Sequence, residues 1–207
     1  MPGSAVARSC FRGLRKALRT HLRDESLRTS YEDAAAQIEE LLDSQPDVPL
    51  TQDSLAGFLN GFLLACTEFA TIELINQQND LMFSVIGGTY LLGAEAPLSC
   101  PPEQLDALRA GFFRRLSGPL LADLLPQPAE VQQRNAVAGD AIRRIFGTTP
   151  DVPVNRESLA GFVLGVMHSH RYIPTDGEAL TAIMVAAYLL ADQSDLDPIR
   201  SDGPGLW

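Results

Sequence analysis

A short sequence element occurs twice in this chain, and the repeat constrains the fold more than any other feature. The segments Asp47-Val48-Pro49 and Ser54-Leu55-Ala56-Gly57-Phe58 recur as Asp151-Val152-Pro153 and Ser158-Leu159-Ala160-Gly161-Phe162. Residues 47–65 and 151–169 agree at nine of nineteen positions, at a constant offset of 104. Such dense agreement indicates that one structural unit has been duplicated within the chain.

The similarity extends on both sides of this element. Tyr90-Leu91-Leu92 recurs as Tyr188-Leu189-Leu190 at an offset of 98, so the first copy has six extra residues within 66–80. Upstream, the pattern of apolar and arginine residues over 11–22 parallels the pattern over 113–124. We therefore expect two repeats, over residues 1–100 and 101–200, followed by a mobile tail at 201–207.

Apolar residues at helical spacing predict four helices in each copy. We expect them over 8–24, 30–44, 51–68 and 78–94 in the first copy, and over 103–124, 129–146, 155–171 and 176–192 in the second. Thr51 and Asn155 are suitable N-caps for the third helix of each copy. Because no segment alternates apolar and polar residues for long enough to form a strand, the predicted class is all-α. We predict a tandem duplication of a four-helix unit, packed as one eight-helix domain with pseudo-twofold symmetry.

Each third helix carries two glycines that lie one turn apart, Gly57 with Gly61 and Gly161 with Gly165. A glycine inside a helix costs about 0.5–1 kcal/mol relative to alanine, so four of them require a compensating contact. We expect another backbone to approach this face closely, most simply because the two third helices cross there. A contact between the third and fourth helices, through Gly87-Gly88, is the alternative arrangement.

Charge is distributed unevenly along the 207 residues. The net charge is −10, but residues 1–28 alone carry +5, so the remaining residues carry −15. This excess of acidic residues argues against nucleic acid as the main partner, because phosphate binding requires a basic surface. The basic first segment is an organellar transit peptide, a membrane-surface helix or the first helix of the fold. The repeat favours the last interpretation, since the same apolar pattern recurs in the second copy.

The sequence contains no motif typical of a catalytic or metal site. His168 and His170 are two positions apart on a predicted helix, so their side chains diverge, and we expect a polar helix end near the surface there. Cys66 follows an apolar helical stretch and is predicted to be a buried thiol. The three cysteines show no spacing typical of a disulfide framework or a zinc site. We therefore expect no enzymatic activity, no cofactor and no bound metal.

An acidic helical protein without a catalytic motif is typical of a protein-binding module. We predict a cytoplasmic inhibitor, an antitoxin-like immunity protein or an adaptor for a basic protein partner, because opposite charge accelerates association. The binding surface should lie where the two copies differ; for example, the positions of Glu39-Glu40 hold Arg143-Arg144 in the second copy. The candidate residues are Glu68, Glu73 and Asp80 in the longer segment of the first copy, and Glu32, Asp33, Glu39, Glu40 and Asp43 along its second helix.

Two other functions are consistent with the sequence. A helical enzyme or small-ligand carrier would have a pocket between the repeats, and the candidate lining residues are Phe58, Phe62, Tyr90, Phe162 and Tyr188. Aromatic residues at helical spacing more often form a core than a pocket, however. A peripheral membrane protein would place the basic helix over 8–23 on anionic lipid. No apolar run reaches the length of a membrane span, so a membrane-spanning protein is not expected.

Overall fold

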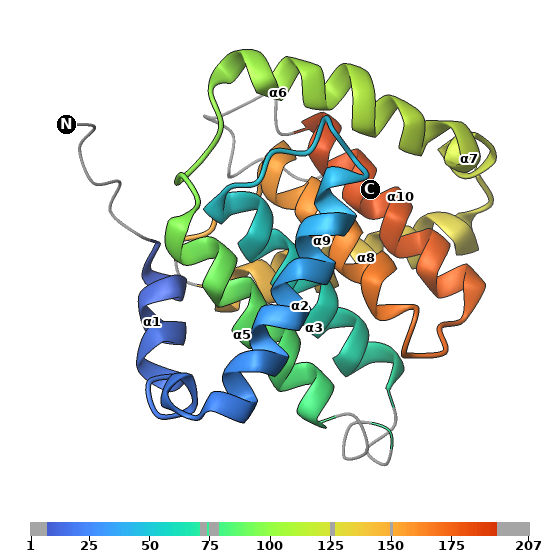
Figure 1. Cartoon of the computed structure of the whole chain (residues 1–207). Coiled ribbons are helices and arrows are strands. Elements are labelled where there is room, and N and C mark those ends of the chain that lie inside the picture. Colours follow the sequence, from blue (N-terminus) through green and yellow to red (C-terminus); the bar gives the residue numbers. More distant parts are fainter. Residues whose placement is uncertain (1–7, 71–73, 75–78, 125–126, 150, 194–207) are drawn as a thin grey trace.

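The computed structural model describes residues 8–70, 74, 79–124, 127–149 and 151–193, and over these residues the chain is helical, with no strand (Figure 1). The first half contains α1 (Ser9–Ala17), the 3-10 turn η1 (His21–Arg23), α2 (Glu25–Asp43), α3 (Gln52–Phe69) and α5 (Asn79–Glu95). The second half contains α6 (Pro102–Leu108), the π-helical turn η2 (Arg109–Phe113), α7 (Arg114–Leu124), α8 (Ala129–Thr148), α9 (Arg156–Ser169) and α10 (Gly177–Gln193). The predicted all-α class is confirmed. The predicted tail at 201–207 lies outside the described residues.

Helices α3 and α9 pack against each other in the core, and each begins at the predicted N-cap. The Thr51 side chain accepts a hydrogen bond from the Ser54 backbone N–H, and the Ser54 hydroxyl accepts one from the Thr51 N–H. Asn155 and Ser158 form the same reciprocal pair at the start of α9. These capping boxes satisfy backbone donors that the first turn of a helix leaves without partners, so both helices can begin in the protein interior.

The glycines of α3 and α9 lie where these two helices touch. A β-carbon at Gly57 would collide with the backbone of Ser158, and one at Gly161 would collide with the backbone of Ser54. Gly61 and Gly165 face the partner helix in the same way, against the backbones of Phe162 and Phe58. The two helix backbones are therefore so close that no residue with a side chain fits at these positions without a shift.

Two further helix pairs flank this crossing, because α2 packs on α5 and α8 packs on α10. A β-carbon at Gly87 of α5 would collide with the ring of Tyr31, and one at Gly88 would collide with the backbone of Ala35. Gly87 and Gly88 thus lie in the contact between α5 and α2. The predicted alternative, in which they form a contact between the third and fourth helices, is wrong. The reason is the size of Tyr31, whose buried ring needs the space that a side chain at Gly87 would take.

The first helix is shorter than predicted but belongs to the fold. It ends at Ala17, and the expected continuation to residue 24 is replaced by the turn η1. Phe11 is buried against Gly93 of α5, and Leu18 is buried in the same core. The apolar side of the basic segment is therefore used inside the molecule, which supports its interpretation as the first helix of the fold.

The segment predicted as one helix over 103–124 is continuous but contains the wide turn η2. Gly111 of this turn lies against the carboxylate of Asp47, to which Arg115 Nη1 donates a hydrogen bond of 2.5 Å. Helices α6 and α7 cross the top of the molecule in Figure 1. The π turn inserts an extra residue, so it changes the direction in which Arg109 and the residues around it point relative to α7.

Candidate functional site

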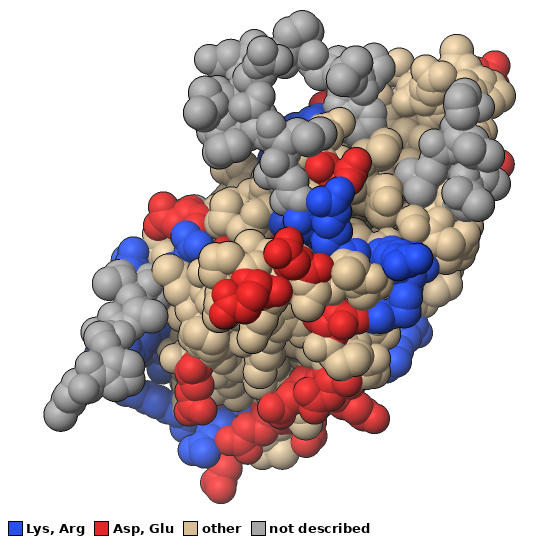
Figure 2. Space-filling view, turned by 90° about the horizontal axis from the view of Figure 1, so that it is seen from above, with Lys and Arg blue, Asp and Glu red and all other residues tan. Residues whose placement is uncertain are grey.

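The acidic residues predicted on the second helix all lie on the exposed side of α2. Tyr31, Ile38 and Leu42 are buried on its inner side. The exposed residues include Glu32, Asp33, Glu39, Glu40 and Asp43. In Figure 2 acidic side chains gather along the lower edge, which corresponds to the front of Figure 1, where α2 lies. The structure thus joins these five carboxylates into one acidic face.

Two residues of this face, Glu32 and Glu39, line a groove of about 510 Å³ between α2 and α5. A third carboxylate, that of Glu95, comes from the end of α5. The rest of the lining is apolar: Ala35, Ala36, Leu50, Leu91, Leu92, Ala96 and Pro97. This combination suits a ligand that carries both apolar and cationic groups, because the apolar wall offers burial and the carboxylates offer charge. Asp33, Glu40 and Asp43 lie on α2 outside this lining.

Among the described residues, the charge of the groove is only weakly compensated. Arg28 Nε donates a hydrogen bond of 2.7 Å to Glu32, and both side chains are more than half exposed. An exposed ion pair of this i,i+4 type contributes only about 0.3–0.5 kcal/mol, so a bound cation can displace Arg28 at little cost.

A second hollow, of about 710 Å³, continues from the groove toward α6. The two hollows share Leu50 and Pro97 in their linings, so they adjoin each other on the surface. The walls of the second hollow come from residues 46–51 and 97–101 together with α6. A peptide segment that entered between α2 and α5 would therefore find further concave surface beyond the end of the groove.

The other predicted acidic cluster is only partly described. Glu68 near the end of α3 and Asp80 near the start of α5 are exposed. Glu73, which completes the predicted cluster, lies outside the described residues. The structure thus places two of these three carboxylates at the surface, at the ends of the segment that joins α3 to α5.

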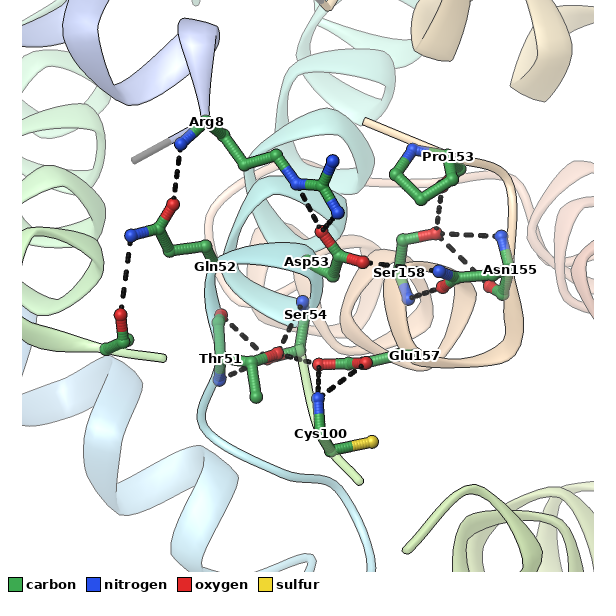
Figure 3. A network of polar contacts seen from close by, with 11 residues as sticks. Arg8, Thr51, Gln52, Asp53, Ser54, Cys100, Pro153, Asn155, Glu157 and Ser158 are labelled. Carbon is green, nitrogen blue, oxygen red and sulfur yellow. Dashed lines mark hydrogen bonds and ion pairs between the residues drawn. The ribbon is translucent and has the colours of Figure 1, made fainter. Parts of the chain in front are cut away.

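A buried polar network lies where the N-termini of α3 and α9 meet (Figure 3). The carboxylate of Asp53, 1% exposed, is 2.8 Å from both Nε and Nη2 of Arg8. Its second oxygen accepts a hydrogen bond of 3.2 Å from the side-chain amide of Asn155, the N-cap of α9. The backbone N–H of Arg8 donates to Gln52 Oε1 at 2.8 Å. The residue just before α1 is therefore tied to the central helix pair.

Glu157 occupies the corresponding position at the start of α9 and is also 1% exposed. Its carboxylate accepts hydrogen bonds from the hydroxyl of Thr51, the N-cap of α3, and from the backbone N–H of Cys100. Burial raises the pKa of Glu157. Burial, together with the nearby Glu157, raises the pKa of the Cys100 thiol to about 12, so this thiol is not a nucleophile at neutral pH. The carboxylates of Asp53 and Glu157 thus each form a hydrogen bond with the N-cap residue of the other helix, and the network stabilises the contact between α3 and α9.

Comparisons with known proteins name no family for this arrangement. No protein-family model, no curated protein and no solved structure matches the chain. The function therefore has to be argued from the geometry and chemistry of the site itself.

The two histidines differ in their surroundings. His168 is 2% exposed and packs against the rings of Phe58, Phe62 and Tyr172. Burial lowers its pKa to about 4, so its ring is neutral at neutral pH. The prediction of a polar helix end near the surface is wrong for His168, because α9 keeps its core-facing side until Ser169. His170, just beyond the helix, is exposed.

The remaining sequence predictions concern Cys66, metal binding and membrane-spanning helices. Cys66 is buried, as predicted, and burial raises the pKa of its thiol to about 11. Among the residues that the structure describes, no group of three or more His, Cys, Asp or Glu side chains is placed to hold a metal ion. Over the same ranges, no helix combines the length and apolar character needed to cross a membrane.

The aromatic residues of the alternative ligand pocket do not form one lining together. Phe58, Phe62 and Phe162 are at most 1% exposed and fill the core. Tyr90 is buried in the same cluster. Tyr188 is half-buried and lines a separate hollow beside α6 and α7.

Glu32 and Glu39 were predicted from the sequence, whereas Glu95, which a different helix brings to the groove, was not. A signal was available, because Glu95 aligns with Gln193 at the offset of 98, so the two halves differ at this position. Asp53 and Glu157 were recognisable as acids that favour a helix N-terminus. Their bonds to the opposite N-caps were not, since these depend on how the two helices cross.

Proposed function

We propose that this chain is a non-enzymatic protein that binds a basic segment of a partner protein in the groove between α2 and α5. The observation that carries the proposal is the placing of Glu32, Glu39 and Glu95 around an apolar lining. Carboxylates beside an apolar surface complement a segment with arginine or lysine next to leucine-like side chains.

The remaining charge of the molecule supports a basic partner. Residues 29–207 carry a net charge of −15, and α2 presents five exposed carboxylates on one face. Such a field accelerates the encounter with a basic protein and directs it toward α2. An inhibitor, an antitoxin-like immunity protein and an adaptor all work by such capture of a basic partner.

We also propose that the two halves descend from a tandem duplication and pack about a pseudo-twofold axis. Reciprocal contacts support this origin: Asp53 bonds to the N-cap of α9, and Glu157 bonds to the N-cap of α3. Gly57 and Gly161 likewise face each other's helices at Ser158 and Ser54. Two copies that share the same core packing can still differ at the surface, and the groove between α2 and α5 lies where their surface residues differ.

The proposal is tested with a synthetic amphipathic peptide of about 18 residues, with leucine at helical spacing and arginine elsewhere. Its dissociation constant is measured by fluorescence anisotropy for the wild type and for the triple variant Glu32→Lys, Glu39→Lys, Glu95→Lys. We expect the triple variant to bind at least about tenfold more weakly. A peptide of the same charge with serine in place of leucine should also bind more weakly, because it loses the apolar contact.

The matched control is the triple variant Asp33→Lys, Glu40→Lys, Asp43→Lys. It changes the net charge by the same amount on the same face, but outside the groove lining. We expect a loss of less than about threefold, from the long-range field alone. Equal losses in the two triple variants would mean that only diffuse electrostatic attraction is present, and the groove would lose its assignment. A variant with Glu68→Lys, Glu73→Lys and Asp80→Lys tests the other acidic cluster in the same assay.

A further inference from the structure

The outer side of α1 and η1 is a basic surface. Phe11 and Leu18 are buried in the core, whereas the arginine and lysine side chains of residues 12–23 are exposed. Four of these exposed side chains define what we call the basic face: Arg15, Lys16, Arg19 and Arg23. Among the residues that the structure describes, no ion pair involves these four side chains. Their positive charges are therefore available to another molecule.

The acidic face of α2 lies beside this basic face. Helix α1 packs on α5, which also packs on α2, and η1 contacts α2 directly. Three carboxylates of the acidic face, those of Asp33, Glu40 and Asp43, are exposed outside the lining of the groove. Figure 2 shows basic side chains at the lower left next to the acidic side chains along the lower edge. One side of the molecule therefore carries a positive and a negative region next to each other.

Exposed apolar side chains lie near the basic face. The side chain of Phe83 on α5 is 42% exposed, and its ring centroid is 6.0 Å from that of His21 in η1. Leu27, in the first turn of α2, is also exposed. Apolar side chains that face solvent among charged ones are typical of protein interfaces, in which an apolar centre is surrounded by polar residues. Phe83 thus offers apolar contact area where α5 meets η1.

The two adjoining charges of opposite sign select the kind of partner. A nucleic acid or an anionic membrane would attract the basic face, but it would repel the carboxylates of α2 and that of Asp80, which is exposed one turn before Phe83. A partner that carries both signs in the reverse order avoids this repulsion. A second molecule of this chain, related by a twofold axis, presents the two faces in the reverse order, so the attractive contact is made twice.

We propose that two molecules of this chain form a symmetric dimer, in which the basic face of each molecule docks on the acidic face of the other and Phe83 lies in the contact. The attraction is mainly electrostatic, so salt should weaken it. The Debye length falls from about 10 Å at 0.1 M salt to about 3 Å at 1 M salt. The dimer does not rest on the proposed capture of a basic partner, because the carboxylates outside the groove can form the contact.

The test measures the dissociation constant of the dimer by sedimentation equilibrium of the full chain, at about 0.1 M and at about 1 M salt. The variant Arg15→Glu with Arg19→Glu makes the basic face acidic and should raise the constant at least about tenfold at the lower salt. The variant Glu40→Arg with Asp43→Arg should raise it by a similar factor. The variant with all four substitutions restores opposite charges across the contact, so its constant should lie within about threefold of the wild-type value.

The matched control is Arg114→Glu with Arg144→Glu. It changes the net charge by the same amount at exposed arginines of α7 and α8, and the constant should stay within about twofold of the wild-type value. Phe83→Ser should raise the constant at least about threefold, because it removes the aromatic ring from the contact. All of these variants leave Glu32, Glu39 and Glu95 unchanged, so a failure of the dimer and a failure of the groove are distinguishable.

The proposal is overturned if the wild type stays monomeric at the lower salt, or if it associates equally well at both salt concentrations. It is also overturned if the variant with four substitutions associates as weakly as Arg15→Glu with Arg19→Glu. An unchanged constant in Phe83→Ser would contradict the place of this ring in the contact. A monomeric wild type that binds vesicles of phosphatidylserine and phosphatidylcholine in equal parts, and loses this binding in Arg15→Glu with Arg19→Glu, would assign the basic face to a membrane instead.

Discussion

The two flanking helix pairs, α2 with α5 and α8 with α10, have similar interiors and different surfaces. Ile38 and Ile142 are both fully buried, as are Leu42 and Phe146 one turn further on. On the outer sides, Glu39 and Glu40 of α2 face solvent where α8 carries Arg143 and Arg144. The first pair forms a groove of about 510 Å³, whereas the hollow between α8 and α10 is about 260 Å³. Packing therefore constrains the inner positions of the two helix pairs and leaves the outer positions free to differ.

The largest expected effect comes from the contact that both halves share. Gly61→Ala and Gly165→Ala should each destabilise the protein by about 3 kcal/mol, because the added methyl group meets the backbone of the opposite helix, which cannot turn aside. The free energy of unfolding in urea measures the change. Gly13→Ala in α1, where nothing lies within 4 Å, is the control and should stabilise by about 0.5–1 kcal/mol. Unchanged urea midpoints for Gly61→Ala and Gly165→Ala would contradict the close crossing.

A second difference between the halves is a buried histidine, which occupies one of two aligned core positions. His168 is buried where the first half has the buried Leu64, at the offset of 104. The pKa of His168 is lowered to about 4, so the folded protein takes up its proton at lower pH than the unfolded chain. The contribution of the neutral ring to stability is complete above the unfolded pKa of about 6.5 and is lost as the pH falls to about 4. The loss should reach about 3 kcal/mol.

His168→Leu gives the second half the side chain of the first and should remove this part of the pH dependence. Stability is measured by urea unfolding at several pH values between 7 and 4 for both proteins. Because burial raises the pKa of Glu157, that carboxyl contributes a change of the opposite sign in acid. It is common to both proteins, so it cancels in the difference. Parallel curves for wild type and variant would show that His168 does not titrate differently on folding.

A third prediction concerns the two buried carboxylates of the crossing, which are compensated differently. Asp53 pairs with the arginine Arg8, whereas Glu157 accepts hydrogen bonds from the Thr51 hydroxyl and from Cys100, which are uncharged donors. Arg8→Gln should therefore destabilise by about 2 kcal/mol at pH 7, because it leaves the charge of Asp53 buried without its cation. In the Asp53→Asn background the same change should cost under about 0.5 kcal/mol. Additive losses in this double-mutant cycle would contradict a direct pair.

The sequence predicted those features that depend on local pattern. The starts of α3 and α9 could be placed at Thr51 and Asn155 because capping depends on residues within one turn. The end of α1 at Ala17 was missed, and so was the π turn at Arg109, which lies where Gly111 and Arg115 contact the distant Asp47. The acidic face of α2 was predicted from spacing alone, but the groove needs α5 to supply Glu95. The hollow beside α6 and α7 was not predicted, because Arg109, Arg114 and Arg156 in its lining are separated in sequence by up to 47 positions and are brought to it only by packing.

The smallest effect on stability is expected from reversing the exposed charges of α2 and α8. These variants also test whether the outer positions can change binding without changing stability. The variants Glu39→Arg with Glu40→Arg, and Arg143→Glu with Arg144→Glu, should each change the free energy of unfolding by less than about 0.5 kcal/mol, because all four side chains are exposed. Binding of the arginine-leucine peptide should nevertheless weaken about tenfold in the first variant and stay within about twofold in the second. Fluorescence anisotropy with the same peptide checks both values. If the α8 variant gains as much affinity for the peptide as the α2 variant loses, the acidic charge alone attracts the peptide. The apolar wall between α2 and α5 would then contribute nothing to its recognition.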